Sequence, residues 1–79
     1  MYQAIINVEP LPEYKLLVTF KNNETRLLDM SPYLNKGIYS ELRDINLFNS
    51  ARVSFDTIEW ANEADIDPEF VYMESKPIT

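Results

Sequence analysis

Hydrophobic and polar residues alternate through the first third of the chain. Apolar side chains recur at every second position in residues 4–10, AIINVEP, and again in residues 14–20, YKLLVTF. This is the period of a strand with one buried face. Pro10 and Pro12 separate the two runs, because proline has no N–H to donate to a sheet. The pattern predicts two antiparallel strands.

A polar stretch follows the second run and predicts a tight hairpin turn. Asn22 and Asn23 lie at its centre, and asparagine is one of the few residues that tolerate the positive φ angles of such turns. Residues 25–30, TRLLDM, then return as a third strand. The first third of the chain therefore predicts a three-strand meander.

The hydrophobic period changes at Ser31, where short helices are expected. Ser31 is a competent N-cap, the proline after it suits the first helical position, and Gly37 suits the end of a helix. Residues 38–44 predict a second short helical turn. Asp44 then predicts an N-cap for a third, over residues 45–51.

A long fourth strand is predicted after the helices. Residues 52–60, RVSFDTIEW, are β-branched and aromatic, with room for a bulge near Asp56. The predicted fold class is α+β: a small antiparallel sheet, built from a three-strand meander, then short helices, then a long fourth strand, with a C-terminal helical turn. We expect a single domain over residues 1–79, with an ordered core over about residues 1–73 and a loose tail over residues 74–79.

The most distinctive motif is the acidic stretch EWANEADIDPEFVY, residues 59–72. We interpret it as a strand end, a tight turn and a capped helical turn. Its structural residues are Trp60, Asn62, Asp65, Ile66, Asp67, Pro68 and Tyr72. Trp60 and Ile66 are expected to point into the core. Asp67 is expected to cap a helix beginning at Pro68, and Asp65 to accept backbone N–H groups of the turn.

The same stretch allows a second interpretation, as a cation site. Asp65, Asp67 and Glu69 alternate as carboxylates do in calcium loops. An EF-hand loop also needs glycine at its sixth position and glutamate at its twelfth, and neither is present here. The alternative to an architectural role is thus a small-ligand or divalent-cation-binding module on the Asp65–Glu69 loop. We assign no catalytic, cofactor-binding or metal-binding residue.

Composition narrows the chemistry further. The chain has no histidine and no cysteine, which excludes histidine-activated nucleophiles and zinc sites built from these residues. Acid–base catalysis by a pair of carboxylates, as in glycoside hydrolysis, needs a cleft of the size of a sugar. So small a chain has little room for such a cleft, and we therefore expect that the protein is not an enzyme. A net charge of −6 disfavours nucleic acid. It either serves only to keep a small protein soluble or favours a basic protein partner. Without a membrane-spanning run or a signal-peptide pattern, we expect a cytoplasmic protein.

Several of these motifs occur together in one known family. They are the alternating strand (Tyr14, Leu16, Val18, Phe20), the turn and strand end (Asn22, Asn23, Asp29), the helical middle (Leu34, Gly37, Leu42, Phe48) and the closing segment from Trp60 to Tyr72. Over nearly the whole chain this pattern resembles the small bacterial domain-of-unknown-function family 2442 (DUF2442). Two positions depart from the family pattern: Ala61 replaces a proline and Glu63 replaces a glycine.

The glycine that Glu63 replaces suggests a positive φ angle, which glutamate disfavours by about 1 kcal/mol or more. We therefore expect either that Asn62 adopts the left-handed conformation or that the turn is remodelled.

The resemblance implies an α+β fold and brings no established activity or catalytic residue. It also implies a binding role, because some family members are fused to a helix-turn-helix domain or encoded beside a suspected toxin. We expect a non-catalytic protein-interaction or regulatory, antitoxin-like module, with a basic, toxin-like partner bound through the acidic loop and an exposed sheet edge. Homodimerisation is a further option, because small sheets have edge strands that need covering.

Overall fold

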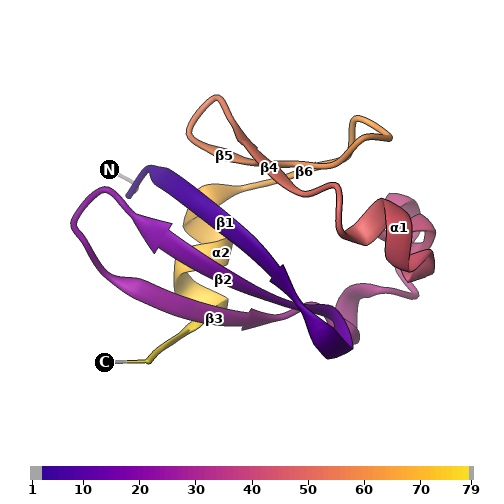
Figure 1. Ribbon diagram of the computed structural model, residues 1–79, viewed down its shortest axis with the longest axis horizontal. Helices are drawn as coiled ribbons and strands as arrows, with labels where there is room; N and C mark the ends of the chain where they lie inside the picture. The colour runs from indigo at the N-terminus through magenta and orange to yellow at the C-terminus, as the bar shows by residue number, and fades with distance from the viewer. Residues whose placement is uncertain (1–2, 79) are drawn as a thin grey trace.

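Two small antiparallel sheets joined by short helices make up residues 3–78, the part of the chain that this computed structural model describes (Figure 1). In chain order the elements are β1 (Ile5–Leu11), η1 (Pro12–Tyr14), β2 (Lys15–Phe20), β3 (Thr25–Asp29), η2 (Ser31–Tyr33), η3 (Gly37–Arg43), α1 (Ile45–Phe48), β4 (Arg52–Ser54), β5 (Thr57–Glu59), β6 (Asp65–Ile66), α2 (Pro68–Glu74) and β7 (Lys76–Pro77), where η marks a 3-10 helix. The predicted α+β class is confirmed.

The first sheet has the order β1-β2-β3-β7, and its first three strands form the predicted meander. Val8 pairs with Val18, and Leu16 pairs with Leu28, so the alternating apolar positions share one face. Helix α2 lies behind this sheet in Figure 1. The turn between β2 and β3 differs slightly from the prediction, because Asn23 alone takes a positive φ, of 71°.

The predicted long fourth strand is wrong, because residues 52–60 form a hairpin. Strands β4 and β5 pair with each other across a turn centred on Phe55 and Asp56, whose φ angles are 50° and 67°. Two successive left-handed residues make the tight turn that matches strand twist. The expected bulge near Asp56 is thus a complete reversal. With β6, the hairpin builds a second sheet of order β4-β5-β6.

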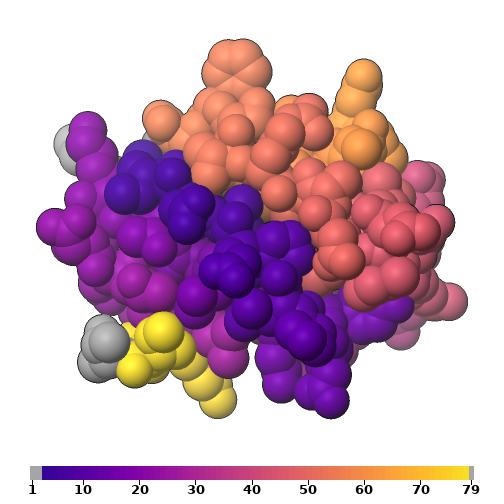
Figure 2. Space-filling model, in the orientation of Figure 1, coloured from indigo at the N-terminus to yellow at the C-terminus, as the bar shows by residue number. Residues whose placement is uncertain are grey.

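Phe55 is an unusual residue for the tip of a hairpin. Its side chain is 98% exposed, and the β4–β5 turn projects at the top of the molecule in Figure 2. Asparagine and glycine are the residues that this turn favours, because they tolerate the left-handed conformation. The local sequence therefore gives no turn signal at the point where the chain reverses.

The helical middle of the chain consists of short turns, most of them 3-10. Asp44 caps α1 as predicted, with its carboxylate accepting the N–H of Asn46 at 2.9 Å. Ser31 was expected to be a cap, but it is the first residue of η2, and the Asp29 carboxylate accepts its N–H at 2.9 Å. The N-cap position is Met30, whose side chain makes no capping bond, and the free N–H of Ser31 is instead satisfied by Asp29, two residues before it.

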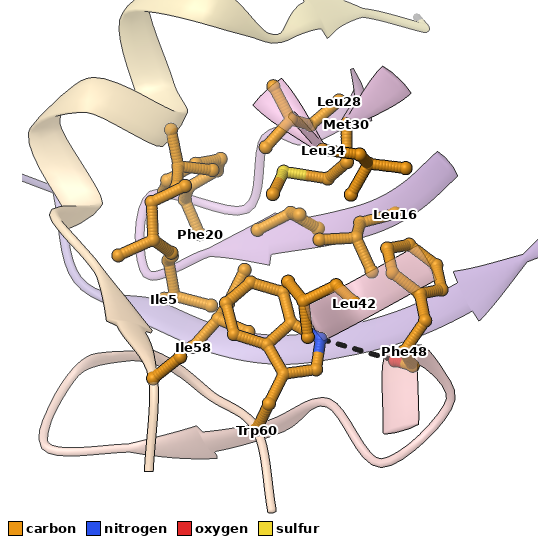
Figure 3. Packing of buried hydrophobic residues seen from close by; sticks show 14 residues of the cluster. Ile5, Leu16, Phe20, Leu28, Met30, Leu34, Leu42, Phe48, Ile58 and Trp60 are labelled. Carbon is orange, nitrogen blue, oxygen red and sulfur yellow. Dashed lines mark hydrogen bonds between the residues drawn. The ribbon is translucent and has the colours of Figure 1, made fainter. Parts of the chain in front are cut away.

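A single hydrophobic core joins both sheets and the helices (Figure 3). Among residues 3–78 its buried members are Ile5, Leu16, Val18, Phe20, Leu28, Met30, Leu34, Leu42, Phe48, Ile58, Trp60, Ala64, Ile66 and Val71. Three of the helices, η3, α1 and α2, each contribute one buried side chain, namely Leu42, Phe48 and Val71. This arrangement lets a small chain keep several irregular turns in place.

The C-terminal tail is partly ordered, contrary to the expectation of a loose segment. Lys76 and Pro77 form β7 and pair with Leu27 and Arg26 of β3. The N–H of Ile78 also donates to a β3 carbonyl, at 3.3 Å. Pairing with a strand so distant in sequence has no local signal. Thr79 lies outside the described residues.

Both edges of the first sheet carry a proline whose nitrogen faces outward. The N–H of Phe20 points to the β3 side, so by alternation the β1 residue paired with Leu16, which is Pro10, turns its nitrogen away from β2. By the same alternation Pro77 turns its nitrogen away from β3. Edge prolines obstruct the addition of a further strand. The expected docking through an exposed edge of this sheet is therefore disfavoured.

Candidate binding face on helix α2

The acidic stretch folds into the end of β5, a tight turn, the short strand β6 and helix α2. Trp60 is completely buried, and its indole N–H donates to the carbonyl of Phe48 at 3.2 Å. Its own backbone N–H donates to the carbonyl of Ala64, which closes the turn. Tyr39 meets the Trp60 ring edge-on at 6.3 Å between centroids. Trp60 thus joins the turn to α1 and η3.

Asn62 carries the side-chain bonds that hold this turn. Its Oδ1 accepts the N–H of Ala64 at 3.1 Å, and its Nδ2 donates to Oε1 of Glu41 at 3.0 Å. Asp65 was expected to accept backbone N–H groups here, but Asn62 does so instead. The Tyr39 hydroxyl donates to the backbone carbonyl of Asp65 at 2.7 Å, while the Asp65 side chain stays exposed.

Glu63 itself takes the left-handed conformation, with φ of 70°. Both expected alternatives, a left-handed Asn62 and a remodelled turn, are therefore wrong. The backbone N–H of Glu63 donates to the carbonyl of Trp60 at 2.9 Å, so the turn keeps a regular hydrogen bond in spite of the disfavoured angle. The side chain is exposed, which leaves the strain in the backbone.

Replacing Glu63 with glycine is expected to stabilise the protein by about 0.5–1 kcal/mol. The left-handed conformation costs a residue with a Cβ about 1–2 kcal/mol, and the greater freedom of glycine in the unfolded chain offsets about 0.4–1 kcal/mol of that gain. Urea unfolding followed by circular dichroism measures the change. Glu63→Ala is the matched control, since it removes the charge and keeps the Cβ. An equal gain in the alanine variant would show that charge, and not backbone strain, is responsible.

The remaining motif residues are structural. Ile66 is buried, and its carbonyl accepts the hydroxyl of Thr57. Asp67 caps α2, with Oδ1 accepting the N–H of Glu69 at 2.9 Å, and Pro68 is the first helical residue. Among residues 3–78 there is no group of three or more aspartates and glutamates that could hold a metal ion. The carboxylates proposed for the cation-binding alternative are therefore not assembled into a site there.

Tyr72 connects α2 to the first sheet through a charged network. Its hydroxyl donates to Oε2 of Glu24, and the guanidinium of Arg26 lies 4.4 Å from the centre of its ring. Arg26 also pairs with Glu24 at 3.0 Å and donates to the Ser75 carbonyl at 2.7 Å. The bond from Tyr72 is the main cause that lowers the pKa of Glu24, and the same bond raises the pKa of Tyr72.

This network predicts a pH window for the effect of Tyr72→Phe. The lowered pKa of Glu24 gives stability that is present above its ordinary value of 4.5 and is lost as the pH falls through the folded value. The raised pKa of Tyr72 gives stability that is present below 10.0 and is lost as the pH rises through the folded value. Tyr72→Phe should therefore lower the melting temperature between these limits, and the difference should shrink in acid.

Tyr39→Phe is the control for this pH dependence. The Tyr39 hydroxyl donates to a backbone carbonyl, which does not titrate. Its loss should lower the melting temperature by a similar amount on both sides of pH 4.5. If the two variants respond identically to acid, the Glu24 carboxylate is not the titrating partner.

The excess of negative charge comes from one segment of the chain. Residues 53–75, here called the acidic segment, hold seven aspartates and glutamates and no lysine or arginine. The rest of the chain holds six acids and seven bases, so it is almost neutral. Bases from outside the segment contact it: Arg52 pairs with Glu59 at 3.1 Å, and Arg26, which is also paired with Glu24, donates to the Ser75 carbonyl. The acidic segment therefore accounts for the whole net charge.

The same segment exposes apolar side chains on helix α2. Phe70 is 37% exposed and Met73 is 72% exposed, at the i, i+3 spacing that places them on one side of a helix. The ring of Tyr33 meets Phe70 edge-on at 5.3 Å, and the Tyr33 hydroxyl donates to Oε1 of Glu74 at 3.1 Å. Tyr33, Phe70, Met73 and Glu74 together are called the α2 face.

A groove borders the α2 face. It has a volume of about 240 Å³ and is lined by Leu27, Asp29, Pro32, Tyr33, Glu74 and Lys76. The N–H of Ser31 is the main cause that lowers the pKa of Asp29, so this carboxylate is ionised at neutral pH. Desolvation, and then Glu74, raise the pKa of Tyr33, which keeps its hydroxyl neutral and able to donate. The groove thus combines apolar walls with two carboxylates.

A larger hollow lies elsewhere on the molecule, between the end of β1 and helix α1. Its volume is about 640 Å³, and its lining consists of Pro10, Leu11, Pro12, Glu13, Ile45 and Asn49. The charged group in this lining, Glu13, is within 3.5 Å of the Lys15 ammonium. This hollow is open and nearly neutral, so it offers little electrostatic selectivity.

The α2 face was not among the sites predicted from the sequence. One signal was present: residues 70–73, FVYM, are apolar at four successive positions of a short helix. A helix on the surface buries only one stripe, so some of these side chains had to face solvent. Val71 is the buried one, and Tyr72 is half-buried under Arg26. Asp29 and Tyr33 lie some forty residues before Glu74 in the sequence, and only the fold brings them to this helix.

The fold and the face define a small, acidic α+β domain with an exposed apolar strip on its last helix. None of the helices in residues 3–78 has the length and apolar character needed to cross a bilayer. The family model described as "Protein of unknown function (DUF2442)" matches residues 5–77, so the chain belongs to this family. The resemblance noted in the sequence is thereby confirmed. No curated protein and no solved structure matches the chain.

Proposed function

We propose that this domain is a non-catalytic module that binds a basic protein partner. The observation that carries the proposal is the separation of charge: the acidic segment holds all of the net charge and also exposes Phe70 and Met73. Protein interfaces combine an apolar centre with a charged rim in this way. A field of one sign speeds association with a partner of the opposite sign and repels partners of the same sign.

The carboxylates support binding more than catalysis. The pKa values of Glu24 and Asp29 are both lowered, so these groups are ionised at neutral pH. A general acid needs a raised carboxyl pKa so that it holds a proton near neutral pH. The acids of the turn and of α2 instead hold backbone N–H groups or lie in solvent, as Asp67 and Asp65 do.

In its finer form, the proposal is a cytoplasmic regulatory module of the antitoxin-like kind. Its partner is then a basic, toxin-like protein whose activity is suppressed in the complex. The complementary charge of such a pair is the physical support for this form. Co-expression with basic proteins encoded beside this chain tests it, and a neighbour that neither binds nor is inhibited contradicts it.

Affinity capture from the source organism tests the proposal as a whole. The full chain is compared with Asp65→Asn/Glu69→Gln, which reduces the charge of the acidic segment, and with Glu9→Gln/Glu13→Gln, which makes the same reduction elsewhere. We expect a basic protein to be retained by the wild type and by the second variant, and to be lost from the first variant and at high salt. Retention that is equal for all three proteins, or a partner that is acidic, would overturn the proposal.

A further inference from the structure

The α2 face and its groove form one surface with an apolar half and an acidic half, so a ligand that covers both needs apolar groups and a positive charge. We propose that this surface docks a cationic amphipathic segment of a protein. A lysine or arginine of that segment enters the groove between Asp29 and Glu74, and its apolar side chains cover Phe70 and Met73. This inference rests on the proposed function and adds to it the site and the kind of segment that the site accepts.

The apolar half is provided by α2, which is fixed to the rest of the domain on its buried side. Val71 is completely buried, and the Asp67 cap fixes the start of the helix. Phe70 and Met73 therefore face outward from a fixed platform. Methionine adapts its shape to irregular partners, and for that reason it is common at binding surfaces.

The cationic half is provided by the groove. Its volume of about 240 Å³ is below the range of about 300–1,000 Å³ that holds a small-molecule ligand, but it suits one long side chain. The aliphatic stem of lysine or arginine can lie along Leu27 and Pro32 while its charged group reaches the carboxylates. The Tyr33 ring adds a cation–π surface. Lys76 also lines the groove and leaves a net charge of one negative unit there.

The same groups disfavour other occupants. A purely apolar ligand would cover Asp29 and Glu74 without pairing them, which is costly for ionised groups. A phosphate or an anionic membrane would meet carboxylates first. A second copy of this chain would bring one acidic segment against another, each chain having a net charge of −6. A segment that is both cationic and apolar satisfies both halves of the surface.

A peptide titration tests the inference with the full chain. The probe is a synthetic peptide of leucine and lysine at helical spacing, and its controls are the same composition in a scrambled order and the same pattern with glutamate in place of lysine. Binding is followed by isothermal titration calorimetry and by backbone NMR shifts. We expect the patterned cationic peptide alone to bind with micromolar affinity, with the largest shifts at residues 29–33 and 70–74.

Three variants locate the binding. Met73→Gln should weaken binding roughly tenfold, because it removes a large exposed apolar contact. Glu74→Gln should weaken it about threefold and reduce its salt dependence. The control is Ile45→Gln on α1, an apolar side chain that is also exposed, although less than Met73, and that should leave the affinity unchanged. Met73 is largely exposed, so its variant should keep the wild-type melting temperature.

The results separate this inference from the proposed function. Equal binding of the glutamate or scrambled peptide, equal affinity of Met73→Gln and wild type, or shifts centred on the hollow at Pro10–Glu13 would each overturn the inference. If the peptide does not bind but a native basic partner is captured, the docking site is wrong and the proposed function stands. If the peptide binds as expected and no native partner is captured, the site stands and the proposed function fails.

Discussion

Trp60→Ala is expected to reduce the free energy of unfolding by about 3–5 kcal/mol. The side chain has no exposed surface, and it packs where the second sheet, η3 and α1 meet. Its removal leaves a large cavity and takes from the Phe48 carbonyl the indole bond, so that this carbonyl keeps only the N–H of Ala51 at 3.3 Å, and both effects are destabilising. Small domains have a total stability of about 5–15 kcal/mol, so this one substitution removes a large fraction of it. Urea unfolding followed by far-ultraviolet circular dichroism measures the loss.

Trp60→Phe separates the ring from its hydrogen bond. Phenylalanine keeps most of the apolar volume but cannot donate to the Phe48 carbonyl, so an intermediate loss of about 1–3 kcal/mol is expected. A loss from Trp60→Ala of less than about 1 kcal/mol would mean that the turn and the second sheet do not depend on this anchor. In that case the buried position of Trp60 would be incidental to stability.

The first sheet was predictable because its signals are local and redundant. Alternation in residues 14–20 gives the buried face of β2, and the Asn22–Asn23 turn gives its register with β3. In β1 the alternation fails at the register shift between Ile5 and Asn7, where Ile5 is buried and Ile6 is exposed. The caps at Asp44 and Asp67 were also predictable, since an aspartate before a short apolar run has few other roles. In each case, adjacent residues carry the whole signal.

The second sheet was missed because its defining turn breaks the local rules. Phe55 and Asp56 adopt left-handed angles inside a run of residues with high β-propensity, where Asn-Gly would mark a hairpin. At Glu63 the disfavoured conformation persists because the bonds of Trp60 and Asn62 determine the turn. Tertiary contacts override the preference of a single residue at these positions. Sequence alone cannot show this, since the stabilising contacts come from other segments.

The candidate site was predictable only in part. The acidic stretch was identified from the sequence, and its charge is what the proposed function uses. Its individual residues, however, are mostly structural: Trp60 and Ile66 fill the core, and Asp67 caps a helix. The exposed side chains of the α2 face lie on α2 and in η2, and Tyr33 is some forty residues from Glu74. Such a juxtaposition depends on the docking of α2, which no local pattern reveals.

Leu42→Ala is expected to cost about 2–5 kcal/mol. Leu42 is the one fully buried residue of η3, while Tyr39 is half-buried against Trp60 and the remaining side chains of η3 are exposed. A 3-10 helix has weaker hydrogen-bond geometry than an α-helix, so η3 depends on its side-chain anchor. The loss should therefore concentrate locally, with amide exchange in residues 37–43 rising more than in the first sheet. Urea unfolding measures the total loss, and hydrogen exchange measures its location.

Ile38→Ala is the matched control for this substitution, because it lies in the same 3-10 helix and removes a similar apolar volume. Ile38 is 49% exposed and lies outside the buried core, so its truncation should cost less than about 1 kcal/mol. Equal losses from the two variants would mean that η3 is stabilised by its intrinsic helicity and not by one anchor. A large loss from Leu42→Ala alone, with exchange raised throughout η3, would show that a single side chain holds the irregular middle of the chain against the sheet.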